Sequence, residues 1–257
     1  MTIRFDVDGA LARVTIDRPE RMNALDTASH ARLAEVWAEI EARPDIRCVV
    51  LTGAGERAFS AGADLKDDSG KSGVDYWKDF GNGFSNISLR RTLKTPVIAR
   101  VNGLALGGGM EMVMGCDIVI AADTARFALP EAKVGRMPLD GGMVMLPRLI
   151  PRNIAVGMML TGRMVGAAEM ARYGFVNAVV PMAELDAEVD RWASDILAGA
   201  PLSQRAIKAL VRDTESLSPH DAYRRDTPEL LAALNSEDAN EGVAAFREKR
   251  APVWKGR

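Results

Sequence analysis

The chain has 257 residues, of which 47% are hydrophobic and 26% are charged, and its formal net charge is −2. This length and composition are typical of a globular protein with one substantial core. Because the charges nearly balance and no polybasic run occurs, nucleic acid and membrane surfaces are not expected as partners.

The N-terminal segment and the most apolar stretch both favour a protein outside the membrane. Residues 1–17 are charged and alternating, and they lack the pattern of a signal peptide. Residues 96–122 are the most apolar, but Arg100, Glu111 and Asp117 interrupt them. A membrane span tolerates such charges poorly, so we expect a buried core and a cytoplasmic protein.

The cysteines and histidines limit the chemistry. The only two cysteines, Cys48 and Cys116, do not suggest a disulfide framework and fit free thiols in a reducing compartment. Neither His30 nor His220 has a histidine or cysteine at ligand spacing. This disfavours a zinc site and a Ser-His-Asp hydrolase, and we expect no metal.

The first half of the chain alternates strands and helices. Residues 3–8 and 11–17 alternate in polarity and predict a hairpin, followed by a helix that Asp26 caps. Residues 47–52 predict a buried strand, and residues 55–73 a long loop. The remaining elements predicted here are a helix over 74–87, a strand over 97–102, a helix over 107–115 and a strand over 117–121.

The second half is mostly helical. A break at residues 199–201 divides the chain into a catalytic core, residues 1–200, and a C-terminal helical region, residues 201–257, which we expect to serve in oligomerisation or as a lid. The predicted helices are 153–161, 167–173, 185–197, 203–213, 222–234 and 237–249, with one strand over 175–180.

Three consecutive glycines, Gly107, Gly108 and Gly109, follow a predicted strand and open a helix. A helix N-terminus has unpaired N–H groups and a partial positive charge, and glycine lets a ligand approach the backbone. The triplet therefore fits an oxyanion site, and it fits close packing of the helix on a sheet equally well.

Two glutamates lie near this triplet in sequence. Glu111 falls about one turn after Gly108 in an apolar helix, where a carboxylate is costly unless it is paired or used. Glu131 follows Pro130 at the start of a short helix, which by itself is an ordinary place for an acid.

Taken together, residues 58–66, 98–111 and 129–135 resemble the enoyl-CoA hydratase/isomerase (crotonase) family. The resemblance extends from residue 23 to the C-terminal tail. It implies an α/β fold, a spiral of β-β-α units with a C-terminal helical region, and a homo-oligomer that is a trimer or a hexamer.

The family resemblance also implies roles for individual residues. The N–H groups of Ala63 and Gly108 would form an oxyanion hole for a thioester carbonyl. Glu111 would activate water and Glu131 would move the proton on the α-carbon, which amounts to hydration of a 2-enoyl-CoA. CoA is then part of the substrate, and no separate cofactor is expected.

Further positions match places where the family contacts the substrate or CoA. They are Ala61, Asp64, Leu65 and Lys66 in the first loop, and Phe246 and Lys249 in the tail, the latter two often acting from an adjacent subunit.

The sequence departs from many hydratases after the second glutamate. Residues 138–147 lack the usual Thr-Gln pair and place Asp140 before two glycines. Asp140 is a possible additional acid, although capping its own turn is the simpler role. The alternatives are an enoyl- or dienoyl-CoA isomerase, an enzyme similar to the carnitinyl-CoA dehydratase branch, or a non-catalytic acyl-CoA-binding protein.

Overall fold

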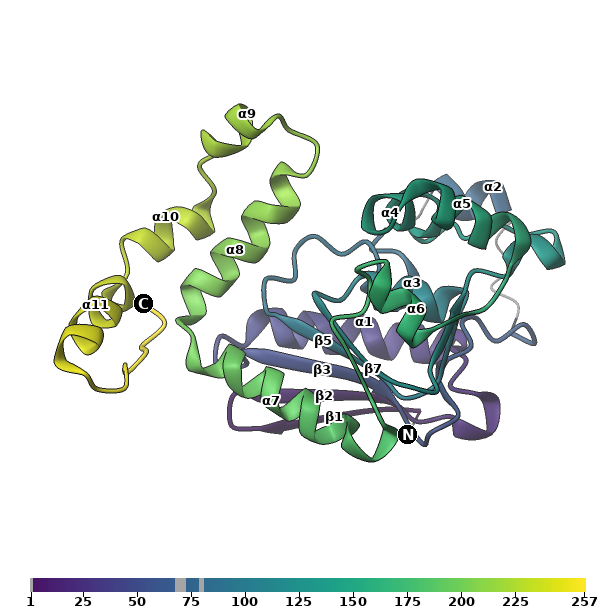
Figure 1. Cartoon of the computed structure of the whole chain (residues 1–257), viewed down its shortest axis with the longest axis horizontal. Coiled ribbons are helices and arrows are strands. Elements are labelled where there is room, and N and C mark those ends of the chain that lie inside the picture. Colours follow the sequence, from purple (N-terminus) through teal and green to yellow (C-terminus); the bar gives the residue numbers. More distant parts are fainter. Residues whose placement is uncertain (1, 68–72, 79–80) are drawn as a thin grey trace.

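The structure is a computed structural model that describes residues 2–67, 73–78 and 81–257. Two sheets form its centre (Figure 1). The six-stranded sheet has the order β1-β2-β3-β5-β7-β10, and the four-stranded sheet has the order β4-β6-β8-β9. The strands are β1 (Ile3–Asp8), β2 (Leu11–Ile16), β3 (Cys48–Gly53), β4 (Ala58–Ser60), β5 (Val97–Val101), β6 (Leu104–Leu106), β7 (Ile118–Ala122), β8 (Arg126–Ala128), β9 (Val165–Gly166) and β10 (Ala178–Val180).

From β3 to β8, successive strands of the chain alternate between the two sheets. After the antiparallel β1–β2 hairpin, the strands β2, β3, β5, β7 and β10 run parallel, and β4, β6 and β8 run parallel in the second sheet. Each of β3, β5 and β7 is followed by its shorter partner in the second sheet. This confirms the predicted α/β spiral of β-β-α units.

The central strands β3, β5 and β7 of the large sheet are buried on both faces. Val49 and Leu51 point to the main core, whereas Cys48 and Val50 point to a second cluster under helix α7 (Leu185–Ala198). Adjacent residues of a strand face opposite sides, so a continuous apolar run is needed when both faces are covered.

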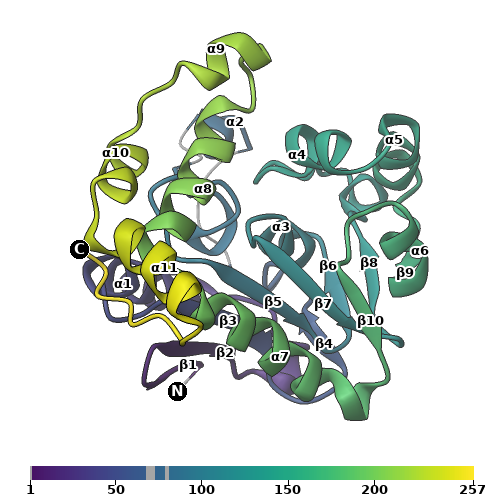
Figure 2. The ribbon, with the colours of Figure 1, turned by 60° about the vertical axis from the view of Figure 1, so that its left-hand side comes forward.

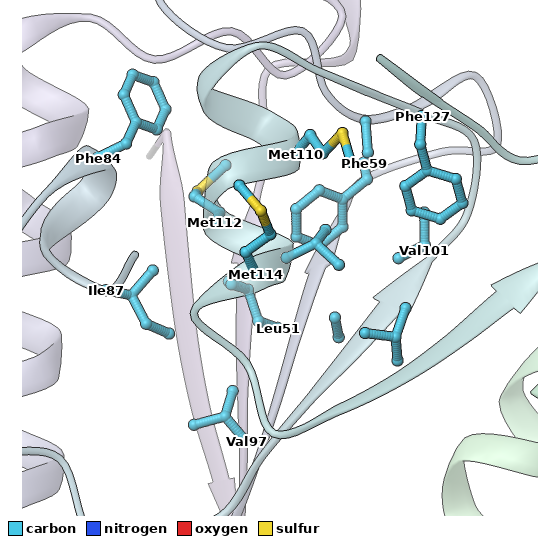
Figure 3. Close-up of a cluster of buried hydrophobic side chains, with 14 of the residues drawn as sticks. Leu51, Phe59, Phe84, Ile87, Val97, Val101, Met110, Met112, Met114 and Phe127 are labelled. Atoms are coloured by element: carbon cyan, nitrogen blue, oxygen red, sulfur yellow. The ribbon is translucent and has the colours of Figure 1, made fainter. Parts of the chain in front are cut away.

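Helix α3 (Gly108–Met114) lies inside the molecule, and all of its residues are buried. Figure 3 shows Met110, Met112 and Met114 of this helix among other core side chains, including Phe59 and Leu51. The predicted helix over 107–115 is therefore confirmed, and its surroundings make Glu111 a carboxyl group in an apolar region.

The other helices surround this centre. Helix α1 (Thr27–Ala42) begins where the Asp26 side chain accepts a hydrogen bond from the Ser29 N–H, as predicted. The remaining helices are α2 (Gly73–Lys78), α4 (Gly142–Leu149), α5 (Arg152–Thr161), α6 (Ala167–Arg172), α8 (Pro201–Thr214), α9 (Pro219–Tyr223), α10 (Pro228–Leu234) and α11 (Glu237–Glu248), with short 3-10 helices η1 (Pro19–Arg21), η2 (Phe84–Asn86), η3 (Glu131–Val134) and η4 (Met182–Glu184).

Helices α8 to α11 form a C-terminal arm beside the sheets, visible from two directions in Figures 1 and 2. The buried Lys208 on α8 anchors the arm, because its Nζ lies 2.6 Å from a carboxylate oxygen of Asp117 and 2.7 Å from the carbonyl oxygen of Thr95. None of the helices described is long and apolar enough to cross a membrane.

Several predicted elements are wrong in extent. The predicted helix over 74–87 is only α2, since residues 83–87 form η2 and its flanks, where Ser85 and Asn86 have positive φ; residues 79 and 80 lie outside the described part. The predicted helix over 222–234 is broken into α9 and α10, because Pro228 starts a new helix capped by Thr227. Strand β4 lies inside the predicted loop over 55–73, and helix α4 was not predicted.

Candidate active site

Two backbone N–H groups near the N-terminus of α3, those of Ala63 and Gly108, have no hydrogen-bond partner among the described residues. Leu25 holds the first loop on both sides of Ala63, since its N–H donates to the Gly62 oxygen and its oxygen accepts from the Asp64 N–H, each at 2.8 Å. The Ala63 N–H between them donates to no group in the described residues. The N–H of Gly108, at the first position of α3, is likewise without a partner there.

The loop that carries Ala63 is in close contact with the start of α3. A Cβ atom placed on Gly62 would lie 3.0 Å from the nitrogen of Gly108. The fold thus brings the segments of the predicted oxyanion donors Ala63 and Gly108 together, and their role toward a ligand oxygen stays a prediction.

The glycine triplet serves both packing and access. Gly107 has φ +55°, a conformation that side chains rarely adopt. A Cβ on Gly108 would lie 2.6 Å from the ring of Phe84, which packs directly on this part of the backbone. The two readings of the triplet, helix packing and oxyanion donation, are therefore compatible rather than exclusive.

Glu111 is 2% exposed and accepts a hydrogen bond from the Gly142 N–H at 2.9 Å through Oε1. Burial, together with the neighbouring Asp140 carboxylate, raises the pKa of Glu111 to about 8. The carboxyl group of Glu111 therefore holds its proton near neutral pH.

Glu131, the first residue of η3, extends its side chain toward Gly107, just before α3. Its Oε1 lies 3.0 Å from the position that a Cβ on Gly107 would occupy, and its Oε2 is buried with no hydrogen-bond partner in the described part of the chain. Burial raises the pKa of Glu131, against a backbone hydrogen bond that lowers it. The two predicted catalytic acids, Glu111 and Glu131, thus flank the N-terminal turn of α3.

Asp140 is the third acid of the site, and it is 6% exposed. Its Oδ2 accepts a hydrogen bond from the Tyr76 hydroxyl at 2.7 Å, and its backbone oxygen accepts one from the Ser88 hydroxyl at 2.6 Å. The expected turn-capping role of its side chain is therefore wrong. Tyr76 was missed in the sequence, because it is 64 positions away and no motif surrounds it.

The residues predicted to contact the substrate in the first loop lie beside this centre. Ala61 and Ala63 flank Gly62, while Leu65 is 75% exposed and Lys66 is exposed. Asp64 instead forms an ion pair with Arg18 at 3.2 Å. That contact gives Asp64 a structural role in holding the loop, and its predicted role toward CoA stays a prediction.

The two predicted contacts in the tail are not brought to the acids within one chain. Phe246, 85% exposed, and Lys249, which ends α11 in a left-handed conformation, lie in the arm, away from α3 in both Figures 1 and 2. Their predicted contact with CoA from an adjacent subunit stays a prediction.

The described residues include no group of three or more His, Cys, Asp or Glu side chains that could hold a metal ion. What the site offers is a pair of N–H donors for an oxyanion, a protonated carboxyl group and a second carboxyl group. Such a set can move a proton at the α-carbon of a thioester and at an oxygen on the β-carbon while stabilising the enolate.

Comparison with known proteins agrees with this geometry. The profile of the enoyl-CoA hydratase/isomerase family matches residues 6–257. The chain belongs to this family. Curated relatives include the carnitinyl-CoA dehydratases of Shigella flexneri and Escherichia coli K12, each 42% identical over 255 residues that cover 97% of this chain and 97% of the relative.

Solved structures of the family superpose over nearly the whole chain. An enoyl-CoA hydratase from Bacillus anthracis is 32% identical with a TM-score of 0.93, and covers 100% of both chains. One from Mycobacterium tuberculosis is 30% identical with a TM-score of 0.91, and the match covers 100% of this chain and 99% of the other. The crotonase-like fold is thereby confirmed.

Proposed function

We propose that the protein is a hydro-lyase of acyl-CoA thioesters, which interconverts a 3-hydroxyacyl-CoA with a 2-enoyl-CoA and water. The observation that carries this proposal is the unequal environment of two acids at one oxyanion site. Glu111 is buried and protonated near neutral pH, whereas Glu131 is partly exposed and free of side-chain partners. Burial raises the pKa of both acids, that of Glu111 to about 8. Two acids in different environments can serve as proton donor and proton acceptor in one reaction.

In the dehydration direction, the thioester oxygen accepts hydrogen bonds from the N–H groups of Ala63 and Gly108. Glu131 removes a proton from the α-carbon, and the electron pair of that bond moves into the thioester enolate. The bond between the β-carbon and its hydroxyl oxygen then breaks as Glu111 gives its proton to the leaving oxygen, which departs as water. Hydration is the same path reversed, so it begins with the proton on Glu131.

The acyl group that we propose is one with a hydroxyl on the β-carbon, as in carnitinyl-CoA. The support is the higher identity to proteins named carnitinyl-CoA dehydratase, 42%, than to the two solved enoyl-CoA hydratases, 32% and 30%. The protonated state of Glu111 is also the state from which dehydration starts. The second candidate is hydration of a simple 2-enoyl-CoA, which the same acids would support.

The test is turnover of three thioesters by the purified protein. Carnitinyl-CoA should gain enoyl absorbance, and crotonyl-CoA should lose it at a lower kcat/KM. A 3-enoyl-CoA tests the isomerase alternative, because its conversion to the conjugated thioester needs no water. Conversion of the 3-enoyl-CoA alone, or tight binding of all three without turnover, would overturn the proposed hydro-lyase.

A further inference from the structure

Asp140 occupies a built position that the reaction written above does not use. Its side chain is buried, the Tyr76 hydroxyl fixes one carboxylate oxygen, and the Ser88 hydroxyl fixes its backbone oxygen. Two residues further on, the Gly142 N–H holds Oε1 of Glu111 at 2.9 Å. One short loop therefore fixes both the catalytic carboxyl group and a second carboxyl group beside it.

We propose that Asp140 is a positioning residue for Glu111, whose fixed negative charge keeps the catalytic proton on Glu111. This inference rests on the proposed hydro-lyase function. Burial raises the pKa of Asp140, and the Tyr76 hydroxyl that donates to its carboxylate acts in the opposite direction, favouring the charged form. Two carboxylates enclosed together cannot both ionise cheaply, and the proton stays on the one that lacks a hydroxyl donor.

Among the residues that the structure describes, no cation acts on Glu111 to cancel this effect. The charged groups that act on it are Asp140 and Glu131, and both raise its pKa. Among the elements packed on α3, the strands β4 and β6 and the helix η2 carry no charged residue. Helix α4 carries Arg148, which is exposed and donates to the Val144 oxygen of its own helix.

Tyr76 is the described side chain that bonds the carboxylate of Asp140. Tyr76 donates to it, and burial with the nearby Asp140 and Glu111 raises the pKa of the Tyr76 hydroxyl, so Tyr76 stays a neutral donor. On α2 the other charged side chains described, Asp75 and Lys78, are exposed.

The pH dependence of turnover distinguishes an effect of the charge on Asp140 from an effect of its hydrogen bond with Tyr76. In the proposed mechanism the active form carries one proton on Glu111 and Glu131 together, and activity is lost at high pH when that proton leaves. Asp140→Asn keeps the size and the acceptor for Tyr76 but removes the charge. We expect the alkaline limb of the kcat/KM profile to move down by about one pH unit, the lower end of what a neighbouring like charge produces.

The matched control is Tyr76→Phe, which loses the contact and keeps the charge. The Tyr76 hydroxyl lowers the pKa of Asp140, so its removal should leave the alkaline limb in place or move it up, and should not move it down as Asp140→Asn does. An unmoved limb in Asp140→Asn, or an equal shift in Tyr76→Phe, would overturn the proposal. If Asp140→Asn does not fold, Asp140→Ser removes the same charge and takes its place.

A second readout needs no turnover. The infrared band of the protonated Glu111 carboxyl group, identified as the band missing from Glu111→Gln, should vanish at lower pH in Asp140→Asn than in the wild type. If no hydroxyacyl- or enoyl-CoA is turned over and this shift still occurs, the proposed function fails while the role of Asp140 stands. If turnover is found and neither the band nor the limb shifts, the role of Asp140 is wrong and the function stands.

Discussion

Glu111 and Gly142 are joined by a hydrogen bond of 2.9 Å between the buried carboxyl oxygen Oε1 and the backbone N–H. The bond links the interior helix α3 to the first residue of α4, so the position of the acid depends on the loop that carries Asp140. A carboxyl group without this donor would be buried with less compensation. The contact also means that an amide at position 111 can keep the geometry while losing the proton chemistry.

The first prediction follows from that geometry. Glu111→Gln and Glu131→Gln should each reduce hydration and dehydration by about 10²- to 10⁴-fold, the usual contribution of a general acid or base. Isomerisation of a 3-enoyl-CoA needs a proton carrier but no water, so Glu111→Gln should retain more of it than Glu131→Gln. Steady-state kinetics with both substrates measures this. Wild-type hydratase activity in either variant would contradict the assignment.

The second prediction concerns stability and pH. The pKa of Glu111 is about 8 in the folded protein, above its ordinary value of 4.5. Its contribution to the free energy of unfolding is fully present below pH 4.5 and is lost as the pH rises to about 8, because in this range the unfolded state releases the proton while the folded state keeps it. Thermal melts of the wild type and Glu111→Gln from pH 5 to 9 should show the variant gaining in relative Tm. A constant difference would mean that Glu111 does not titrate in this range.

The third prediction tests whether the N–H of Gly108 donates to the thioester oxygen. The variants must be chosen with regard to Phe84, which packs on Gly108. Alanine and proline at position 108 would both add a Cβ, which would meet the Phe84 ring at 2.6 Å. We therefore expect Gly108→Ala alone to lose activity by displacing Phe84. In a Phe84→Ala background, Gly108→Ala keeps the N–H and Gly108→Pro deletes it.

The comparison between those two double variants isolates the hydrogen bond. Proline suits the first turn of a helix, so α3 should persist, and circular dichroism checks this. The proline variant should have a kcat about 10²- to 10³-fold below that of the alanine variant, the effect of losing one oxyanion donor. Equal rates would show that Gly108 is not a donor to the thioester.

The sequence indicated the site better than it indicated the surroundings of the site. Gly108, Glu111 and Glu131 could be found because each lies in a local motif, and the fold does bring them together. The part played by Phe84 could not be found from the sequence. Its contact with Gly108 depends on the positive φ of the next two residues, Ser85 and Asn86, and sequence patterns do not predict such a conformation.

The role of Asp140 was mistaken for a similar reason. An aspartate before two glycines is a common turn signal, and only the tertiary structure shows that Tyr76 from another element bonds it. The predicted long helix after residue 74 failed because Gly81 and Gly83, both with positive φ, interrupt it. Helix α4 went unpredicted because it contains Pro147 and starts among glycines, which normally indicate loops.

The fourth prediction concerns the anchor of the C-terminal arm. Asp117 contacts the buried Lys208 at 2.6 Å and Arg212 at 3.2 Å, and it also accepts from the Val97 N–H at 2.8 Å. Asp117→Ala should lower the free energy of unfolding by about 3–5 kcal/mol, because it leaves a buried ammonium unpaired. Lys208→Met should cost much less, since it removes that buried charge while Arg212 still pairs with Asp117. Chemical denaturation measures both, and equal losses would contradict a role for the pairing.

The last prediction is that the protein assembles into a trimer or a hexamer through the arm. Large apolar side chains are exposed along it: Ile207 (64%) and Val211 (67%) on α8, Leu234 (66%) on α10, and Val243 (52%) and Phe246 (85%) on α11. Such a series of apolar side chains on one projecting element is typical of a surface that is covered in the assembled protein. Light scattering should give a mass three or six times that of one chain, and Leu234→Asp should lower it. The matched control is Leu160→Asp, on α5 and 76% exposed, outside the arm.

If Phe246 and Lys249 reach the active site of a neighbouring copy, Leu234→Asp should also raise the KM for acyl-CoA more than it lowers kcat. A wild type that stays monomeric at micromolar concentration would refute the assembly, and with it the proposed contribution of these two residues to CoA binding.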